Sequence, residues 1–159
     1  MIAEITPIAQ LYAMADKILG QVVGDFTEAD WQVRDPAGHT PRWIMGHLAA
    51  SRLRLVELMG MEPILVEWMA VFGRGTSDAD VPEHLDLRSV VQAFHDAHQR
   101  MAAHWEKLAP EQLAKPLGRT LPDGSDSIGG AIRFLAWHEA YHLGQLGMLR
   151  RLAGKPGLA

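Results

Sequence analysis

Apolar residues recur along the chain at the three- and four-residue spacing of an amphipathic α-helix, in four long segments. The pattern predicts helices at about 6–24, 40–59, 87–108 and 128–153. A Thr-Pro pair opens each of the first two segments, where Thr can cap the helix and Pro presets its first turn. No segment shows the alternation of a β-strand over a useful length. The chain is therefore predicted to be all-α.

Four amphipathic helices without strands predict a four-helix bundle, with residues 1–159 forming a single domain. The connections between the helices are longer than the roughly 2–8 residues of a bundle hairpin, so at least one long crossover connection is expected. The segment 63–72 is apolar and is predicted to be a short helix. We expect it to cover one end of the core, with a contribution to a dimer contact as the alternative.

Composition narrows the function classes. The net charge is −4 and the basic residues are scattered, which argues against a nucleic-acid partner. No apolar stretch is long enough to span a membrane and no secretory signal is visible, so a cytoplasmic location is expected. Cysteine is absent, which excludes disulfides and thiolate ligands. With eight histidines, any metal site would use nitrogen and oxygen ligands.

The fourth segment contains polar residues where a buried helix would carry leucines. Its predicted inward seam consists of Ile128, Ala131, Leu135, His138, His142, Gln145, Leu149 and Leu152. Three consecutive members of this seam are polar, and burying each without a partner would cost about 2–7 kcal/mol. Groups on the neighbouring helices must therefore satisfy His138, His142 and Gln145.

His138 and His142 are four residues apart, so their imidazoles can converge on one ion. With Glu139 they match the His-Glu-x-x-His pattern of zinc proteases, but neither a downstream third ligand nor an edge strand is visible. A third nitrogen can come from another helix. His47 lies at the edge of the inward stripe of the second segment, and His98 lies on the inward face of the third. Spacing alone leaves both open.

The segments Trp43-Ile-Met-Gly-His47-Leu and His138-Glu-Ala-Tyr-His142-Leu-Gly-Gln145-Leu together resemble the DinB-like (YfiT-like) metal-binding four-helix bundles. The resemblance covers nearly the whole chain, including the connector at 27–31 and the loop at 72–76. It implies an up-down-down-up bundle, a homodimer, and a divalent metal held by His47, His138 and His142. It also implies, for some members, transferase or isomerase activity with thiols such as bacillithiol or mycothiol.

These observations predict a divalent-metal-binding protein that acts as a thiol S-transferase, joining a low-molecular-weight thiol to a small electrophile. Three imidazoles leave an open position on Zn²⁺ or Ni²⁺, the metals expected here, or on Fe or Mn, and a thiol or water bound there becomes a nucleophile. The alternatives are a metal-dependent hydrolase, a non-catalytic metal-binding or stress-related bundle, and a metal-free bundle with an interaction role.

Three further residues are weaker candidates for the chemistry. Gln145 could orient a bound water or substrate. Arg74, between two glycines, could bind an anionic substrate, although a flexible surface turn explains it equally well. Glu139 and Tyr141 flank the histidine pair and are expected to face solvent or to support the ligands, with Glu139 a weak candidate for a general base.

Overall fold

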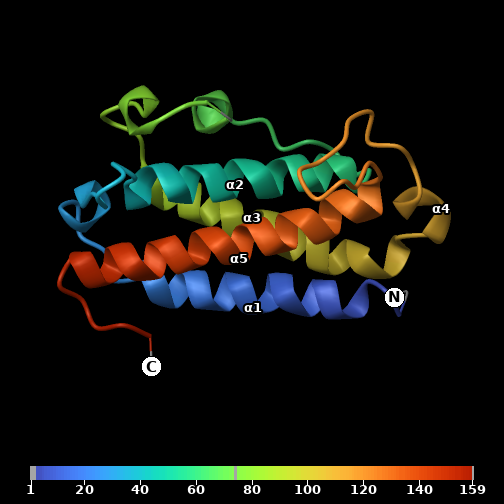
Figure 1. Cartoon of the computed structure of the whole chain (residues 1–159), viewed down its shortest axis with the longest axis horizontal. Helices are drawn as coiled ribbons and strands as arrows, with labels where there is room; N and C mark the ends of the chain where they lie inside the picture. Colours follow the sequence, from blue (N-terminus) through green and yellow to red (C-terminus); the bar gives the residue numbers. More distant parts are fainter. Residues whose placement is uncertain (1–2, 74, 159) are drawn as a thin grey trace.

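The computed structural model describes residues 3–73 and 75–158, and it confirms the all-α four-helix bundle (Figure 1). The four long helices are α1 (Thr6–Val23), α2 (Pro41–Leu58), α3 (Leu87–His104) and α5 (Ile128–Leu152). The described residues form no strand, and a single isolated bridge joins Pro116 to Ser127. None of the helices in this part of the chain is long and apolar enough to cross a membrane.

The helices follow an up-down-down-up course. In Figure 1, α1 and α5 run in one direction while α2 and α3 run in the other. Because α2 and α3 are parallel, the connection 59–86 must return along the whole length of the bundle, and it does so over the outer side of α2. Helix α2 packs against α3 and α5, and α1 packs against α5 and α3, so α3 and α5 lie diagonally across the bundle.

Short helical pieces occupy the connections. They are η1 (Asp30–Gln32), η2 (Glu67–Phe72), η3 (Asp78–Asp80), η4 (Trp105–Lys107) and α4 (Pro110–Leu113). The helix predicted at 63–72 is wrong in its first half, because the chain becomes helical only at Glu67. It covers the core as predicted, since Phe72 is fully buried, but it lies over the side of α2 and not at one end of the bundle.

Two predicted helix starts have the expected caps. The hydroxyl of Thr40 accepts a hydrogen bond from the amide of Trp43, and Ser127 accepts one from Gly130. Thr6 is different: it is the first residue of α1 rather than its cap, and Ile5 occupies the cap position without a side-chain hydrogen bond. The ring of Pro7 fits the first turn whether Ile5 or Thr6 is the cap, which is why the sequence pattern assigned the cap to Thr6.

The inward face of α5 differs from the predicted seam. The buried residues of this helix include Ile132, Glu139, Leu143, Leu146 and Arg150, while Leu152 is 53% exposed. Each residue turns an α-helix by about 100°, so this face is rotated by roughly one residue from the line through His138 and His142. The reason is that α1 and α2 contact α5 from two sides. The histidines therefore lie at the edge of the core that faces α2.

A buried ion pair joins α2 to α5 at the centre of that core. Arg52, 1% exposed, donates from Nε to Oε2 of Glu139 at 2.8 Å and from Nη2 to Oε1 at 2.5 Å. Its Nη1 also donates to Asp16 of α1 at 2.7 Å, and its guanidinium carbon lies 3.5 Å from the ring centre of Phe94 of α3. One side chain thus contacts all four long helices.

A second charged cluster fastens the crossover connection to the start of α2. Asp78, in η3, is buried and accepts hydrogen bonds from Arg42, Arg34 and the hydroxyl of Thr40. Burial alone would raise the pKa of Asp78, but the hydrogen bonds from Arg42, Thr40 and Arg34 outweigh it and hold the pKa at about 2. The carboxylate therefore stays charged at neutral pH and keeps its ion pairs with Arg42 and Arg34.

We predict that Arg52→Ala lowers the free energy of unfolding by about 3–5 kcal/mol, because it leaves the Glu139 carboxylate buried without its counter-ion. Urea unfolding at neutral pH measures the change. The double variant Arg52→Met/Glu139→Leu removes both charges and should recover most of the loss, and Arg151→Ala on the exposed side of α5 should change little. Equal stability of Arg52→Ala and Arg151→Ala would show that the pair does not stabilise the core.

Candidate metal centre

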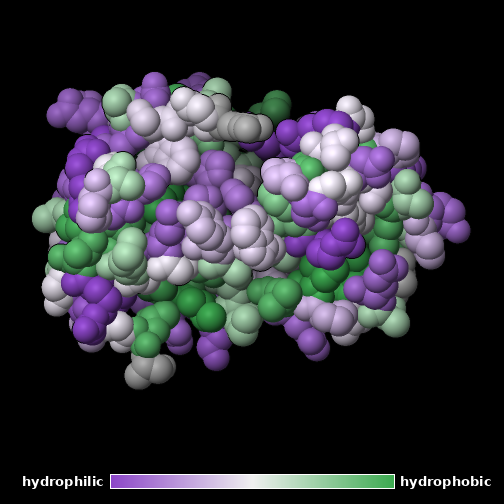
Figure 2. Space-filling model, viewed as in Figure 1, coloured by the Kyte–Doolittle hydropathy of each residue, from purple (hydrophilic) through white to green (hydrophobic). Residues whose placement is uncertain are grey.

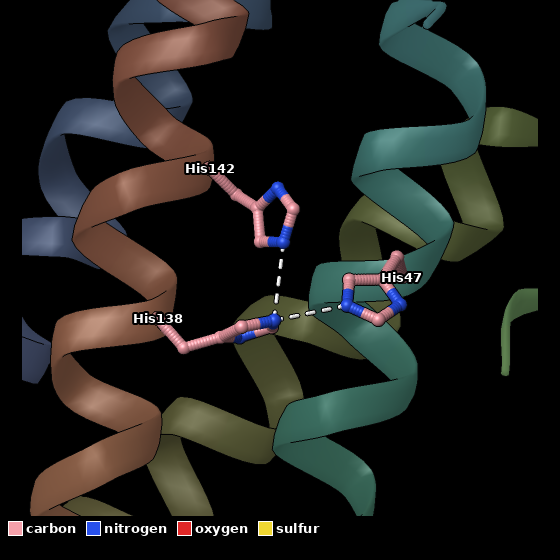
Figure 3. A group of neighbouring side chains, drawn as sticks. All are labelled: His47, His138 and His142. Atoms are coloured by element: carbon pink, nitrogen blue, oxygen red, sulfur yellow. Dashed lines mark hydrogen bonds between the residues drawn. The ribbon is translucent and has the colours of Figure 1, made fainter. Parts of the chain in front are cut away.

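Three histidine side chains meet in the space between α2 and α5 (Figure 3). His47 comes from α2, and His138 and His142 come from successive turns of α5. The Nε2 atom of His138 lies 3.0 Å from Nε2 of His47 and 3.1 Å from Nε2 of His142. Within the described residues, these three form the one cluster of potential ligands, with the ligand atoms all within 4.8 Å of one another.

Two of the imidazoles are oriented through their other nitrogen. Nδ1 of His47 lies 2.9 Å from the carbonyl oxygen of Phe72, and Nδ1 of His142 lies 2.6 Å from Oε1 of Gln145. Both oxygens can only accept, so each Nδ1 carries the hydrogen and donates it. In a neutral imidazole this leaves Nε2 with a free lone pair, directed at the centre of the cluster.

The proton count shows why this arrangement fits a cation. Nε2 of His138 faces the bare Nε2 atoms of both His47 and His142, but one nitrogen can carry only one hydrogen. At least one of the two short contacts therefore brings two lone pairs together, which is repulsive. A divalent ion bound to all three nitrogens at about 2.0–2.1 Å would place them roughly 3.3 Å apart and would turn each lone pair into a bond.

The surroundings keep these imidazoles neutral. Burial lowers the pKa of His138 to about 4, with a further contribution from His47. Burial also lowers the pKa of His142 to about 4, helped by His138, and the pKa of His47 is lowered for the same main reason. Neutral imidazole is the form that binds metal, so the three side chains are ready for a ligand role at neutral pH.

Aromatic rings hold the triad from the sides. The ring of Trp43 stacks on His47 with 4.9 Å between centroids, and its Nε1 donates to the hydroxyl of Thr76 in the crossover connection at 3.2 Å. Phe134 lies one turn before His138 on α5, with its ring roughly parallel to the imidazole. These contacts restrict the rotation of the His47 and His138 imidazoles.

Gly46 allows the crossover connection to reach His47. A Cβ atom at this position would lie 2.2 Å from ring atoms of Phe72, a distance that two carbon atoms cannot adopt. Because glycine stands there, the Phe72 ring rests directly on α2 and its backbone carbonyl meets Nδ1 of His47. Sequence reasoning missed this contact, since no spacing rule reports where the carbonyl of a distant loop will lie.

The other residues named from the sequence have different surroundings. Gln145 accepts the hydrogen bond of His142 Nδ1 and its Nε2 lies 3.5 Å from the Tyr141 hydroxyl, so it orients the imidazole of His142. Glu139 faces away from the triad, with both carboxylate oxygens bound to Arg52. His98, on α3, lies outside the cluster. Arg74 is outside the described residues.

The buried Arg52 was also missed by sequence reasoning. Its apolar neighbours at helical spacing were a usable signal that it faces the core, and they are Leu48, Leu55 and Val56.

Comparisons with known proteins agree with this fold. The model of the DinB superfamily matches residues 10–146. Among solved structures, the chain is similar to YfiT from Bacillus subtilis, which has been described as a probable metal-dependent hydrolase with an unusual four-helix bundle topology. The TM-score is 0.70 and the identity 18%, and the alignment covers 98% of this chain and 91% of that one. A search of curated proteins finds no match.

We predict that Gly46→Ala weakens metal binding roughly 10- to 100-fold although all three histidines remain, because the added methyl displaces Phe72 and the carbonyl that orients His47. Competition with a chromophoric zinc chelator measures the affinity, and the circular dichroism spectrum verifies that the variant is folded. Gly20→Ala is the matched control, since nothing lies within 4 Å of its added Cβ. Unchanged affinity in Gly46→Ala would contradict a role for the Phe72 carbonyl.

Proposed function

This chain belongs to the DinB superfamily, and from that membership and the geometry of its triad we propose that it binds one divalent metal ion and is a metal-dependent hydrolase. The ligands would be Nε2 of His47, His138 and His142. The observation that carries the proposal is the convergence of three nitrogens with too few hydrogens for their short contacts. Zn²⁺ and Ni²⁺ suit a site of three imidazoles, and Fe²⁺ and Mn²⁺ are the other metals to test.

Three protein ligands on one ion are typical of catalytic sites, where the remaining position holds water or substrate. A divalent ion held there acts as a Lewis acid and lowers the pKa of a bound water toward neutrality. The chain's own residues fix the ligand geometry: the Phe72 carbonyl orients His47 and Gln145 orients His142. Glu139 would take no part as a base, since Arg52 occupies both of its oxygens.

Thiol transfer is the second candidate reaction. A thiol can occupy the same open position as water, and it becomes a thiolate when it binds a metal. Because the chain has no cysteine, the sulfur nucleophile would come from a separate small molecule. The description of YfiT as a hydrolase supports water as the nucleophile, so hydrolysis is the first reaction to test.

We further propose that the expected homodimer forms through the face made by α1 and α5. Apolar residues gather between these two helices on the surface seen in Figure 2. A groove of about 720 Å³ lies there, and its lining includes the small residues Ala140, Gly144 and Gly147 and the large residues Leu11, Met14 and Trp137. The large side chains of one copy can pack against the small residues of the other copy, and a twofold interface makes this contact twice.

The exposed area on this face fits a second copy of the chain. The large apolar side chains that line it and are roughly half exposed are Leu11, Met14, Trp137 and Leu158, and Tyr141 and Met148 of α5 are exposed to a similar extent. A large side chain that is about half exposed offers on the order of 100 Å², so the four that line the groove offer on the order of 400 Å² per copy. Standard interfaces bury about 800 Å² per partner, a value that the patch and the polar residues around it can reach.

We predict that protein without a histidine tag, stripped with a chelator and reloaded, contains about one equivalent of Zn or Ni by elemental analysis. His47→Ala and His138→Ala should bind at least 100-fold more weakly, because each removes one of three ligand bonds. His98→Ala is the control and should keep its metal. Metal content unchanged in His47→Ala, or lost in His98→Ala, would show that the ligand set is wrong.

Turnover is tested on the same proteins. Hydrolysis of p-nitrophenyl acetate should depend on the metal and fall at least 100-fold in His138→Ala. Conjugation of a small thiol to 1-chloro-2,4-dinitrobenzene tests the second reaction. A protein that binds one equivalent of metal but accelerates neither reaction would support a structural or sensory ion instead of an enzyme.

We predict that the chain is a dimer at tens of micromolar by size-exclusion chromatography with light scattering, and that Met14→Glu makes it a monomer, because the new carboxylate would be buried without a partner at the interface. Leu65→Glu is the control: Leu65 is 87% exposed and lies outside this face, so this variant should remain dimeric. A monomeric wild-type chain would rule out the α1–α5 dimer.

A further inference from the structure

An arginine on the same face of α2 as His47 has no role in the fold. Arg54 follows His47 by seven residues, which is close to two full turns and about 10 Å along the axis. Side chains of a helix tilt toward its N-terminus, so this guanidinium extends back toward His47. It reaches the turn after η2, where its Nη2 atom lies 3.9 Å from the position that a Cβ on Gly73 would take.

That turn is the one that orients His47. The residue before Gly73 is Phe72, whose carbonyl accepts the hydrogen bond of His47 Nδ1. His47 and Arg54 therefore meet adjacent residues of the crossover connection, Phe72 and Gly73. The proximity has an electrostatic consequence: besides burial, the charge of Arg54 contributes to lowering the pKa of His47.

The Arg54 guanidinium has no counter-ion in the described part of the chain. Arg34, Arg42, Arg52 and Arg150 all pair with carboxylates, whereas no ion pair or hydrogen bond joins Arg54 to a described residue. The triad itself consists of neutral groups, and the buried carboxylate that follows His138 in the chain, Glu139, is already neutralised by Arg52. A metal ion bound beside Arg54 would bring together about three positive charges without a protein anion to balance them.

Like charges repel, and although solvent reduces the repulsion at the exposed Arg54, an ion at the triad would still lack a balancing anion. An anion that contacts both the metal position and the guanidinium provides that balance. The planar fork of arginine donates two parallel hydrogen bonds, which match the paired oxygens of a carboxylate or phosphate. Figure 2 shows hydrophilic residues in the recess between the connection over α2 and helix α5, where such a ligand would enter.

We propose that Arg54 is the specificity residue of this site and binds a terminal oxyanion, carboxylate or phosphate, of a substrate whose reacting group lies at the triad. This inference rests on the proposed function. The substrates are then small, negatively charged molecules with the scissile group a few bonds away from the charge. Neutral analogues of the same size lack the group that Arg54 would bind.

Isothermal titration of the zinc-loaded protein with two probes tests the inference. Glutaric acid monohydroxamate and its methyl ester share a metal-binding hydroxamate and differ in the charge at the far end. The wild-type protein should bind the charged probe roughly 10- to 100-fold more tightly, the usual worth of hydrogen bonds to a charged group. A phosphonate with the same spacer distinguishes carboxylate from phosphate recognition.

The variants separate this role from a structural one. Arg54→Gln should lose the preference while its zinc content and its affinity for the ester stay unchanged, since the side chain is exposed and holds nothing in the fold. Arg54→Lys keeps the charge but not the fork and should give an intermediate preference. Arg151→Gln, on the exposed side of α5, is the control and should behave as the wild type.

The outcomes are distinguishable. A protein that takes up one equivalent of zinc but binds both probes equally, or whose preference survives in Arg54→Gln, would overturn the role of Arg54 and leave the metal site intact. A protein that takes up no zinc would overturn the proposed function and the bridging role together.

Discussion

The buried pair of Arg52 and Glu139 determines how α5 is rotated against α2, and the rest of the site depends on that rotation. Each residue turns a helix by about 100°, so the face with Glu139 and the face with His138 cannot both point at the centre of the core. The two-point contact with Arg52 directs Glu139 inward and leaves His138 at the edge beside His47. Rotating α5 to bury the histidines would expose the Glu139 carboxylate and leave the buried Arg52 guanidinium without its counter-ion. That costs far more than leaving the histidines at the edge of the core.

This pair also explains why the His-Glu-x-x-His letters do not describe a protease here. In the protease motif the glutamate is available to a metal-bound water. Here a guanidinium occupies both of its oxygens inside the core, and burial raises the pKa of Glu139 while Arg52 opposes the rise. In this helix Glu139 of the pattern stabilises the core, whereas His138 and His142 belong to the candidate metal site. Spacing identifies which residues share a face, but the partner helix decides what each face does.

Much of the fold followed from helical periodicity, because four long amphipathic segments have few ways to bury their apolar faces. The up-down-down-up order came from the family resemblance, since periodicity carries no information about direction. Periodicity also could not choose between His47 and His98, as both lie on or beside inward faces. The choice depends on which helices are neighbours: α2 packs against α5, whereas α3 lies diagonally across from it. The Phe72 carbonyl was beyond sequence reasoning, since every residue has a carbonyl and only the course of the chain selects one.

The topology and the site are connected through the crossover. Parallel α2 and α3 require a long return connection, and here it lies over α2, fastened by Asp78 at one end of the helix and by Phe72 against Gly46. The connection thereby brings the Phe72 carbonyl to His47 and places its turn at Gly73 beside Arg54 of α2. A hairpin between antiparallel neighbours would leave this side of α2 bare. Because all three candidate ligands are neutral, a bound ion would keep its full charge, and the charged group of α2 that meets the connection at Gly73 is the cation Arg54. Such a site favours ligands that carry their own negative charge, and this electrostatic preference follows from the topology as much as from the histidines.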